Sequence, residues 1–246
     1  MKNKKELNMK TPFLSKYDII IFDCDGVLID INLLKCEAFG KAVGGYSSEI
    51  VENFVKHCRK TFGISRYVKF KEFLSDFAKE DFQEEKYNIF LNNFAKICKE
   101  IYEYANITPG SKELLLALSI QNKNLYVASG SDEKELNKVF INRNLSKYFN
   151  GIYGSPKTKL ECTSIILKNH PGTNAVFIGD ALSDMKTAKE HDIDFIYMSK
   201  YTVQSEEQDL ICKNGAKMVI STLEELINSE CNKKQQVALA QVNNNL

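Results

Sequence analysis

The chain has 246 residues, of which 43% are apolar and 26% charged, and its formal net charge is +1. This length fits one large domain or a core with an insertion, and the apolar content can fill a sizeable interior. The balanced charge gives no electrostatic reason to expect a nucleic acid or a membrane as a partner. The seven cysteines contain no C-x-x-C pair, which argues against a disulfide framework and a zinc site.

The N-terminus carries lysines but no apolar segment behind them, so no signal peptide is expected. No run approaches the roughly 20 apolar residues of a membrane span. We therefore expect a cytoplasmic protein.

Two carboxylates follow the first apolar run. Residues 19–22 (IIIF) predict a buried strand of a parallel sheet, and Asp23 and Asp25 come next, before Gly26. Ligands of open α/β sheets bind at the carboxyl ends of such strands. Side chains alternate along a strand, so both acids should project to one side. Acids this close imply a divalent metal or a shared proton. The alternative is a strand that merely ends in a polar turn.

Residues 32–105 show apolar side chains at intervals of three and four, which predicts amphipathic helices and no strand. The longest of these helices is expected over residues 85–104. Arg66 and Lys69 lie three residues apart and would share one helix face, where they could clamp a second anionic group of a substrate. The alternative for this pair is a solvated basic edge.

From residue 106 onward, predicted strands and helices alternate. Strands are expected at 125–129, 151–153, 175–178, 195–198 and 218–220, and a final helix with a capping box begins at Ser221. This alternation is typical of an α/β fold with a doubly wound parallel sheet. We expect a discontinuous core (residues 17–31 and 106–228), a helical insertion (32–105) and flexible tails (1–16 and 229–246).

Three further groups of polar residues follow predicted strands. Ser129 and Gly130 precede a helix, where main-chain N–H groups and the helix dipole favour an anion, although Asp132 is expected simply to cap that helix. Lys157 and Lys159 lie near another helix N-terminus, where a cation is disfavoured unless an anion binds nearby. Asp180 and Asp184 can converge on one ion, and oxygen ligands without Cys or His suit Mg²⁺.

The run from Asp23 to Leu28 (DCDGVL) resembles the first motif of the haloacid dehalogenase-like phosphohydrolases. The resemblance implies that Asp23 is the nucleophile and Asp25 the acid/base group. It also implies that the helical insertion is the family's cap, in the branch that includes phosphoglycolate phosphatases and β-phosphoglucomutase. The resemblance further implies that Ser129 and Gly130 bind phosphate, and that Lys159, with Lys157 as the alternative, neutralises its charge. It also implies that Mg²⁺ is bound by Asp23, Asp180, Asp184 and the Asp25 carbonyl.

These patterns together predict a Mg²⁺-dependent phosphomonoesterase that acts on a small phosphorylated metabolite through an aspartyl phosphate. A phosphosugar mutase on the same core and a non-catalytic metabolite-binding module are the alternatives. A sugar phosphate, an acylneuraminate-type phosphate and phosphoglycolate all remain open as substrates.

Overall fold

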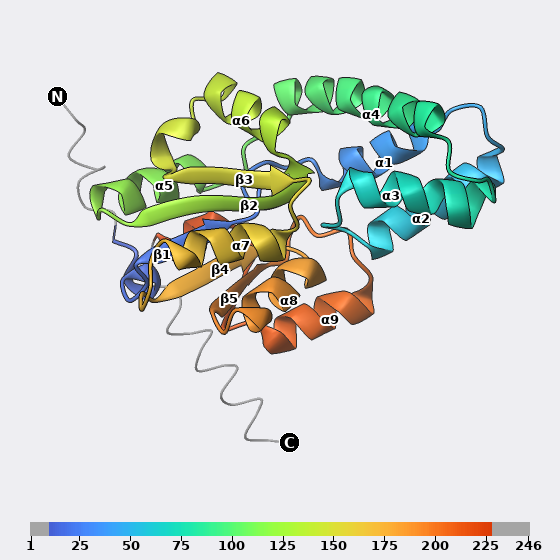
Figure 1. The fold of residues 1–246 in the computed structure, drawn as a ribbon. Coiled ribbons are helices and arrows are strands. Elements are labelled where there is room, and N and C mark those ends of the chain that lie inside the picture. Colours follow the sequence, from blue (N-terminus) through green and yellow to red (C-terminus); the bar gives the residue numbers. More distant parts are fainter. Residues whose placement is uncertain (1–9, 228–246) are drawn as a thin grey trace, which may run out of the picture.

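The computed structural model describes residues 10–227. Within them, six parallel strands form one sheet in the order β3-β2-β1-β4-β5-β6 (Figure 1). The strands are β1 (Ile19–Phe22), β2 (Asn124–Asp132), β3 (Gly151–Ser155), β4 (Ala175–Gly179), β5 (Asp194–Met198) and β6 (Met218–Ile220). Strand β1 lies inside the sheet, paired with β2 on one side and with β4 on the other, and the later strands of the chain extend the sheet away from β1 on both sides. Such a switch point is where α/β sheets bind ligands.

Helices cover both faces of the sheet. They are α5 (Ser111–Ile120), α6 (Glu133–Asn142), α7 (Lys159–Lys168), α8 (Leu182–Glu190) and α9 (Glu206–Gly215), with short 3-10 helices η2 (Pro12–Leu14), η4 (Ser146–Tyr148) and η5 (Leu223–Leu226). Every residue of β1 is buried, and alternate side chains enter different clusters. Ile19 and Ile21 join the cluster that contains Cys162 of α7 and Ala188 of α8. The apolar run of β1 therefore reflects burial on both faces.

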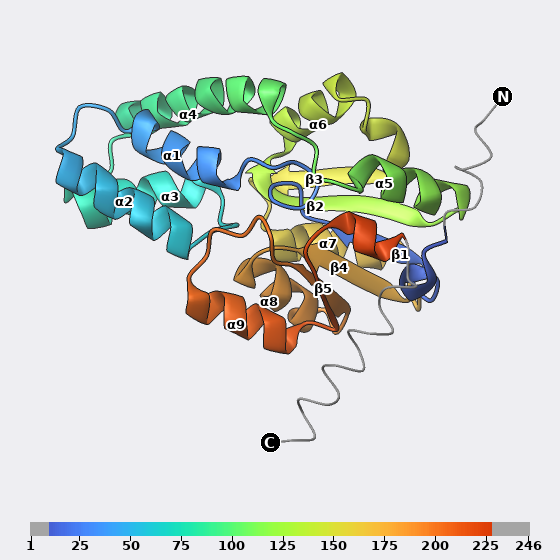
Figure 2. The same ribbon diagram turned by 180° about the vertical axis from the view of Figure 1, so that it is seen from behind.

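A group of helices between β1 and β2 stands beside the ends of the strands (Figures 1 and 2). We call it the helical insert; it comprises α1 (Asn32–Ala42), α2 (Ser48–Lys60), α3 (Arg66–Glu72), the π-helix η3 (Phe73–Ala78) and α4 (Glu84–Tyr104). Its interior is largely aromatic, with ring centroids 4.2 Å apart for Phe39 and Phe94 and 4.8 Å apart for Phe54 and Phe73. Stacked and tilted phenylalanine pairs of this kind stabilise a small core beyond their buried area.

The two connections between core and insert run side by side. The N–H of Asp30 donates to the carbonyl of Asn106 at 2.9 Å, and Ile29 forms an antiparallel bridge with Ile107. The N–H of Thr108 donates to the carbonyl of Leu28 at 3.1 Å. The insert therefore leaves and rejoins the core at one place.

The predicted α/β fold with a parallel sheet is confirmed, and the structure differs from the sequence-based prediction at three places. Helix α9 was not predicted, although Ser205 caps its first turn. The predicted final helix is the four-residue 3-10 helix η5, within the described residues. In the predicted N-terminal tail, residues 12–14 form η2 and Leu14 is fully buried. Residues 1–9 and 228–246 lie outside the described part.

Across residues 10–227, we find no helix whose length and apolar character would let it span a bilayer.

Candidate active site

Asp23 and Asp25 leave β1 on a turn that only glycine can complete. Gly26 has φ +79°, in the left-handed region, and a Cβ there would collide with Asn32 and with the carboxylate of Asp180. The N–H of Gly26 donates to the carbonyl of Ile29 at 2.8 Å, which closes the turn. The missing side chain thus lets the end of β1 approach the end of β4.

The carboxylate of Asp25 is held by three buried side chains. Lys35 Nζ lies 2.5 Å from Oδ2, Ser131 Oγ donates to the same oxygen at 2.7 Å, and Tyr102 OH donates to Oδ1 at 2.6 Å. Lys35 also donates to Ser131 Oγ. Burial alone would raise the pKa of Asp25, but the charge and hydrogen bond of Lys35, with the two hydroxyl groups, lower it. Two of the three partners come from the helical insert, on α1 and α4.

Asp23 belongs to a group of three buried acids. Asp23, Asp180 and Asp184 are buried, and each offers a carboxylate oxygen within 4.8 Å of the others. Asp184 Oδ2 accepts from the N–H groups of Asp180 and Ala181, at 3.2 and 3.1 Å, which fixes it at the start of α8. Asn32 Nδ2 donates to Asp180 Oδ2 at 2.5 Å. The ends of β1 and β4 therefore bring three carboxylates to one point.

This acid cluster fits a hard divalent cation. Burial, followed by the charges of Asp23 and Asp184, raises the pKa of Asp180 well above its usual value, and burial raises the pKa of Asp184 to about 6. Asp180 Oδ1 is buried, and no group in residues 10–227 forms a hydrogen bond with it. A Mg²⁺ ion would neutralise the repulsion and satisfy this oxygen, because Mg²⁺ takes oxygen ligands and few carboxylates. The donor set contains no sulfur or imidazole that would favour a softer metal.

Lys159 completes the charge balance of this cluster. Its Nζ lies 2.8 Å from Asp23 Oδ2 and 2.5 Å from Asp184 Oδ1. Burial would lower the pKa of Lys159, but these two carboxylates raise it. Lys157, the alternative from the sequence, is 41% exposed and pairs with Glu133 at 3.0 Å. The structure thus places Lys159, and not Lys157, among the acids.

Ser129 and Gly130 lie at the end of β2 and line the same pocket as Asp23 and Asp25. Ser129 is buried, and its hydroxyl accepts from the N–H of Ser131 at 3.3 Å. A Cβ on Gly130 would collide with the carbonyl of Gly63 in the insert. Asp132 caps α6 by accepting from the N–H of Glu135 at 3.0 Å, as predicted.

Arg66 and Lys69 are both buried and both line the pocket, so neither forms a solvated edge. The Arg66 guanidinium makes two hydrogen bonds to Glu135 of α6, at 2.7 and 2.6 Å, and stacks 4.6 Å from the ring centroid of Phe94. Lys69 Nζ donates to the carbonyl of Cys58 at 2.8 Å. The two cations therefore have different surroundings, although they lie on one helix.

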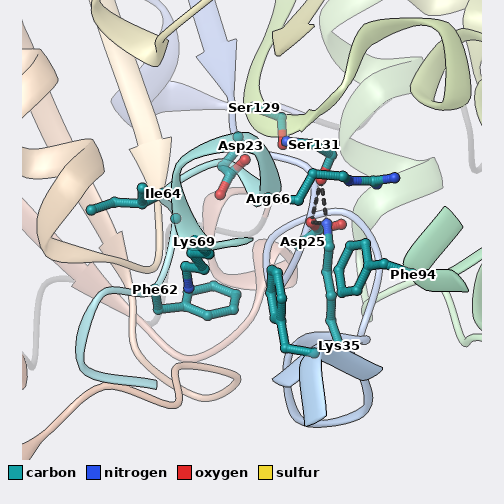
Figure 3. Close-up of a pocket in the computed structure, with 13 residues that line it drawn as sticks. Asp23, Asp25, Lys35, Phe62, Ile64, Arg66, Lys69, Phe94, Ser129 and Ser131 are labelled. Carbon is teal, nitrogen blue, oxygen red and sulfur yellow. Dashed lines mark hydrogen bonds and ion pairs between the residues drawn. The ribbon is translucent and has the colours of Figure 1, made fainter. Parts of the chain in front are cut away.

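The pocket is a small space of about 30 Å³ between core and insert (Figure 3). Figure 3 shows Lys35 and Ser131 meeting at Asp25, with Asp23 beside them and the Arg66 guanidinium pointing away. The aromatic walls are Phe39, Phe62 and Phe94 of the insert. Since one water needs roughly 10–15 Å³ of such space, the pocket holds about two waters, and most substrates would enter only after the insert moves.

Sequence reasoning missed Lys35, Tyr102, Ser131 and Asn32. A signal existed for Lys35, which occupies the first position of a stripe continued by Ala38, Phe39 and Ala42, where an apolar residue is expected. A lysine on a buried stripe needs a counterion. Tyr102 gave no such signal, because tyrosine is ordinary in a stripe with Phe94 and Cys98.

The model of the haloacid dehalogenase-like hydrolase family matches residues 20–198, and the chain belongs to that family. The match begins within β1 and ends with β5. It therefore includes the ends of β1 and β2, which carry Asp23, Asp25 and Ser129 of the pocket. No curated protein matches the sequence.

Solved structures of similar fold cover most of the chain. A predicted phosphoglycolate phosphatase from Haemophilus somnus has 18% identity and a TM-score of 0.67, and covers 86% of this chain and 96% of its own. CbbY from Rhodobacter sphaeroides, in complex with phosphate, has 17% identity and a TM-score of 0.68, with 85% and 96% covered. YfnB from Bacillus subtilis, named a HAD hydrolase and bound to magnesium, has 16% identity and a TM-score of 0.62, with 86% and 97% covered. At these identities the likeness shows the fold.

Proposed function

We propose that the protein is a Mg²⁺-dependent phosphomonoesterase that hydrolyses a small phosphorylated metabolite, such as a sugar phosphate or a phosphoglycolate-like ester. One observation carries the proposal. Two aspartates of the same turn each pair with a lysine but differ in their other neighbours. Asp23 lies beside Lys159 and two further carboxylates, whereas Asp25 lies beside Lys35 and two hydroxyl groups. This separation suits a nucleophile and an acid/base group in one pocket.

In the proposed first step, a carboxylate oxygen of Asp23 attacks phosphorus. The ester P–O bond breaks, its electron pair goes to the leaving oxygen, and the acid form of Asp25 donates a proton to that oxygen. Lys159 neutralises charge beside Asp23, and Ser129 with nearby main-chain N–H groups orients the phosphoryl oxygens. Mg²⁺, held by Asp23, Asp180, Asp184 and the Asp25 carbonyl, would supply further charge neutralisation.

In the second step, Asp25 accepts a proton from water as the water oxygen attacks phosphorus. The bond to the Asp23 oxygen breaks, phosphate leaves and the Asp23 carboxylate is restored. The lowered pKa of Asp25 favours the carboxylate that this step requires. The helical insert would act as the cap over the pocket, and Arg66 and Lys69 are proposed to determine specificity.

A screen of phosphorylated metabolites, with released phosphate as the readout, tests this function. Hydrolysis of at least one small monoester, lost on rigorous chelation and restored by Mg²⁺, is the expected result. Isomerisation of a phosphosugar without release of phosphate would indicate a mutase. Binding without either reaction would indicate a metabolite-binding module, an outcome that the presence of both Asp23 and Asp25 argues against.

A further inference from the structure

Asn32, the first residue of α1 in the helical insert, contacts the acid cluster of the core. It is only 1% exposed, and its Nδ2 donates to Asp180 Oδ2 at 2.5 Å and to the carbonyl of Tyr201 at 2.8 Å. Asp180 comes directly after β4, and Tyr201 lies in the turn that follows β5. One side chain of the insert is therefore hydrogen-bonded to a carboxylate that lies far from it in the sequence.

The two neighbours of the Asn32 amide fix its orientation. Both are acceptors, so only the Nδ2 end can face them, and a reversed amide would place its oxygen against a carboxylate. The Oδ1 end is buried, and no group in residues 10–227 donates to it. A buried acceptor without a donor is unfavourable. The side chain is thus placed for its contacts with Asp180 and Tyr201, although its own oxygen remains unsatisfied there.

The hydrogen bond from Asn32 holds one oxygen of Asp180 and leaves the other open. Oδ2 accepts from Asn32, whereas Oδ1 is buried and has no partner in the described part of the chain. Asp23 and Asp184 bring carboxylate oxygens within 4.8 Å, so like-charge repulsion favours turning Asp180 away from them. A Cβ on Gly26 would collide with both Asn32 Nδ2 and Asp180 Oδ2. The glycine turn therefore leaves room for the contact that opposes this rotation.

We propose that Asn32 is a positioning residue of the metal site, which holds Asp180 so that its Oδ1 stays available to the ion. This inference rests on the Mg²⁺ site of the proposed function, but not on the hydrolytic reaction. A carboxylate that is already ordered binds an ion more tightly, because binding does not have to order it. Partners that orient metal ligands typically contribute a factor of about 10 to 100 in affinity. The insert then contributes to the metal site as well as to the wall of the pocket.

Calorimetric titration of Mg²⁺ into the substrate-free protein tests the proposal. Asn32→Leu has a similar shape but no donor, and it should raise the Kd of Mg²⁺ by about tenfold or more. Asn93→Leu is the matched control, because Asn93 also belongs to the insert and its Nδ2 donates to the carbonyl of Ala42, at the other end of α1, at 3.2 Å. This control removes a hydrogen bond to α1 without touching the acids, so it should bind Mg²⁺ as the wild-type protein does.

A double variant shows whether Asn32 acts through Asp180. In Asp180→Ala protein the side-chain acceptor is gone, so adding Asn32→Leu should change the Kd of Mg²⁺ by less than about twofold. A further tenfold loss would mean that Asn32 affects the metal independently of Asp180, and would overturn the proposal. Thermal unfolding without metal shows whether each variant is folded. If the leucine variant does not fold, Asn32→Ala, which cannot overfill the site, takes its place with the same expectation.

The titration also separates this inference from the proposed function. An unchanged Kd in a folded Asn32 variant would overturn the inference and confine Asn32 to joining the insert to the turn after β5, whatever the unfolding temperature. Raised Kd values in the variants, with no monoester hydrolysed by the wild-type protein, would refute the proposed activity alone, because the titration uses no substrate. If the wild-type protein binds no Mg²⁺, the metal site and this inference both fail.

Discussion

The core side and the insert side of the pocket handle buried charge in different ways. On the core side, the acids at the ends of β1 and β4 lie close together around Lys159, and one oxygen of Asp180 has no hydrogen-bond partner within the described part of the chain. On the insert side, the cations Lys35, Arg66 and Lys69 lie beside aromatic side chains, and Lys69 has no carboxylate partner among residues 10–227. Buried negative charge in excess favours a bound cation, whereas an isolated buried cation favours a bound anion. Under the proposed function, the two halves of the pocket would bind different parts of a metal-bound phosphate ester.

The largest expected effect falls on the core side. Asp23→Asn should lower turnover by a factor on the order of 1000 or more, because an amide cannot act as the anionic nucleophile. The substitution is nearly isosteric, so the thermal unfolding curve should stay close to that of the wild-type protein. Phosphate release at the wild-type rate, with mass spectrometry excluding deamidation, would refute the covalent route.

The next effect concerns the acid cluster. Asp180→Ala should weaken activation by Mg²⁺ by a factor on the order of 100, since it removes a ligand and not merely a supporting contact. Excess Ca²⁺ should inhibit the wild-type protein, because it prefers more ligands and longer bonds. Titration of activity with Mg²⁺ measures both. Full activity after rigorous chelation would remove Asp180 and Asp184 from the metal site.

The fold and the core half of the pocket could be predicted because chemistry and structure coincide there. Asp23, Ser129 and Asp180 each follow an apolar run, and parallel strands bring their carboxyl ends to one edge. The insert half could not be predicted in this way. Lys35 and Tyr102 reach Asp25 only after two helices have packed, and their spacing along the chain does not reveal that contact.

The sequence pattern also left open whether Arg66 and Lys69 face a ligand or solvent. Their separation by three residues placed them on one helix face, but it could not show that Glu135, on α6 of the core, occupies the guanidinium. Helix α9 was missed for a different reason. Its charged residues weaken the apolar periodicity, so that only the Ser205 cap marks its start.

A variant of the insert tests whether that side only recognises substrate. Lys35→Met should leave the Asp25 carboxyl protonated at higher pH, because the charge that lowers its pKa is gone. Hydrolysis of the aspartyl phosphate, which requires Asp25 as a base, should then slow by about tenfold at neutral pH and recover as pH rises. With acetyl phosphate as the phosphoryl donor, the phosphorylated protein should accumulate, which intact-mass spectrometry detects. An unchanged pH profile of kcat would confine Lys35 to a structural role.

The smallest effect is a pH dependence of metal binding. The pKa of Asp184 is raised to about 6, and Mg²⁺ binds the carboxylate form, so a proton competes with the metal as pH falls through that value. This group alone should weaken Mg²⁺ binding by about fourfold between about pH 7 and 5.5. Calorimetric titrations in two buffers of different ionisation enthalpy should show proton release. Equal affinities at both pH values would contradict the raised pKa.

The adjacent connections at Ile29 and Ile107 have a consequence for how the chain folds. Ile19 of β1 pairs with Asn124 of β2, so the central strands can meet only after the long intervening segment has closed into a loop. Closing a long loop costs conformational entropy before any pairing compensates for it, and distant pairings slow folding. If the helical insert folds early and brings residues 29 and 107 together, the remaining loop is short. Destabilising the packed rings of Phe39, Phe54, Phe73 and Phe94 should therefore slow the formation of the sheet, although these four residues all lie in helices of the insert.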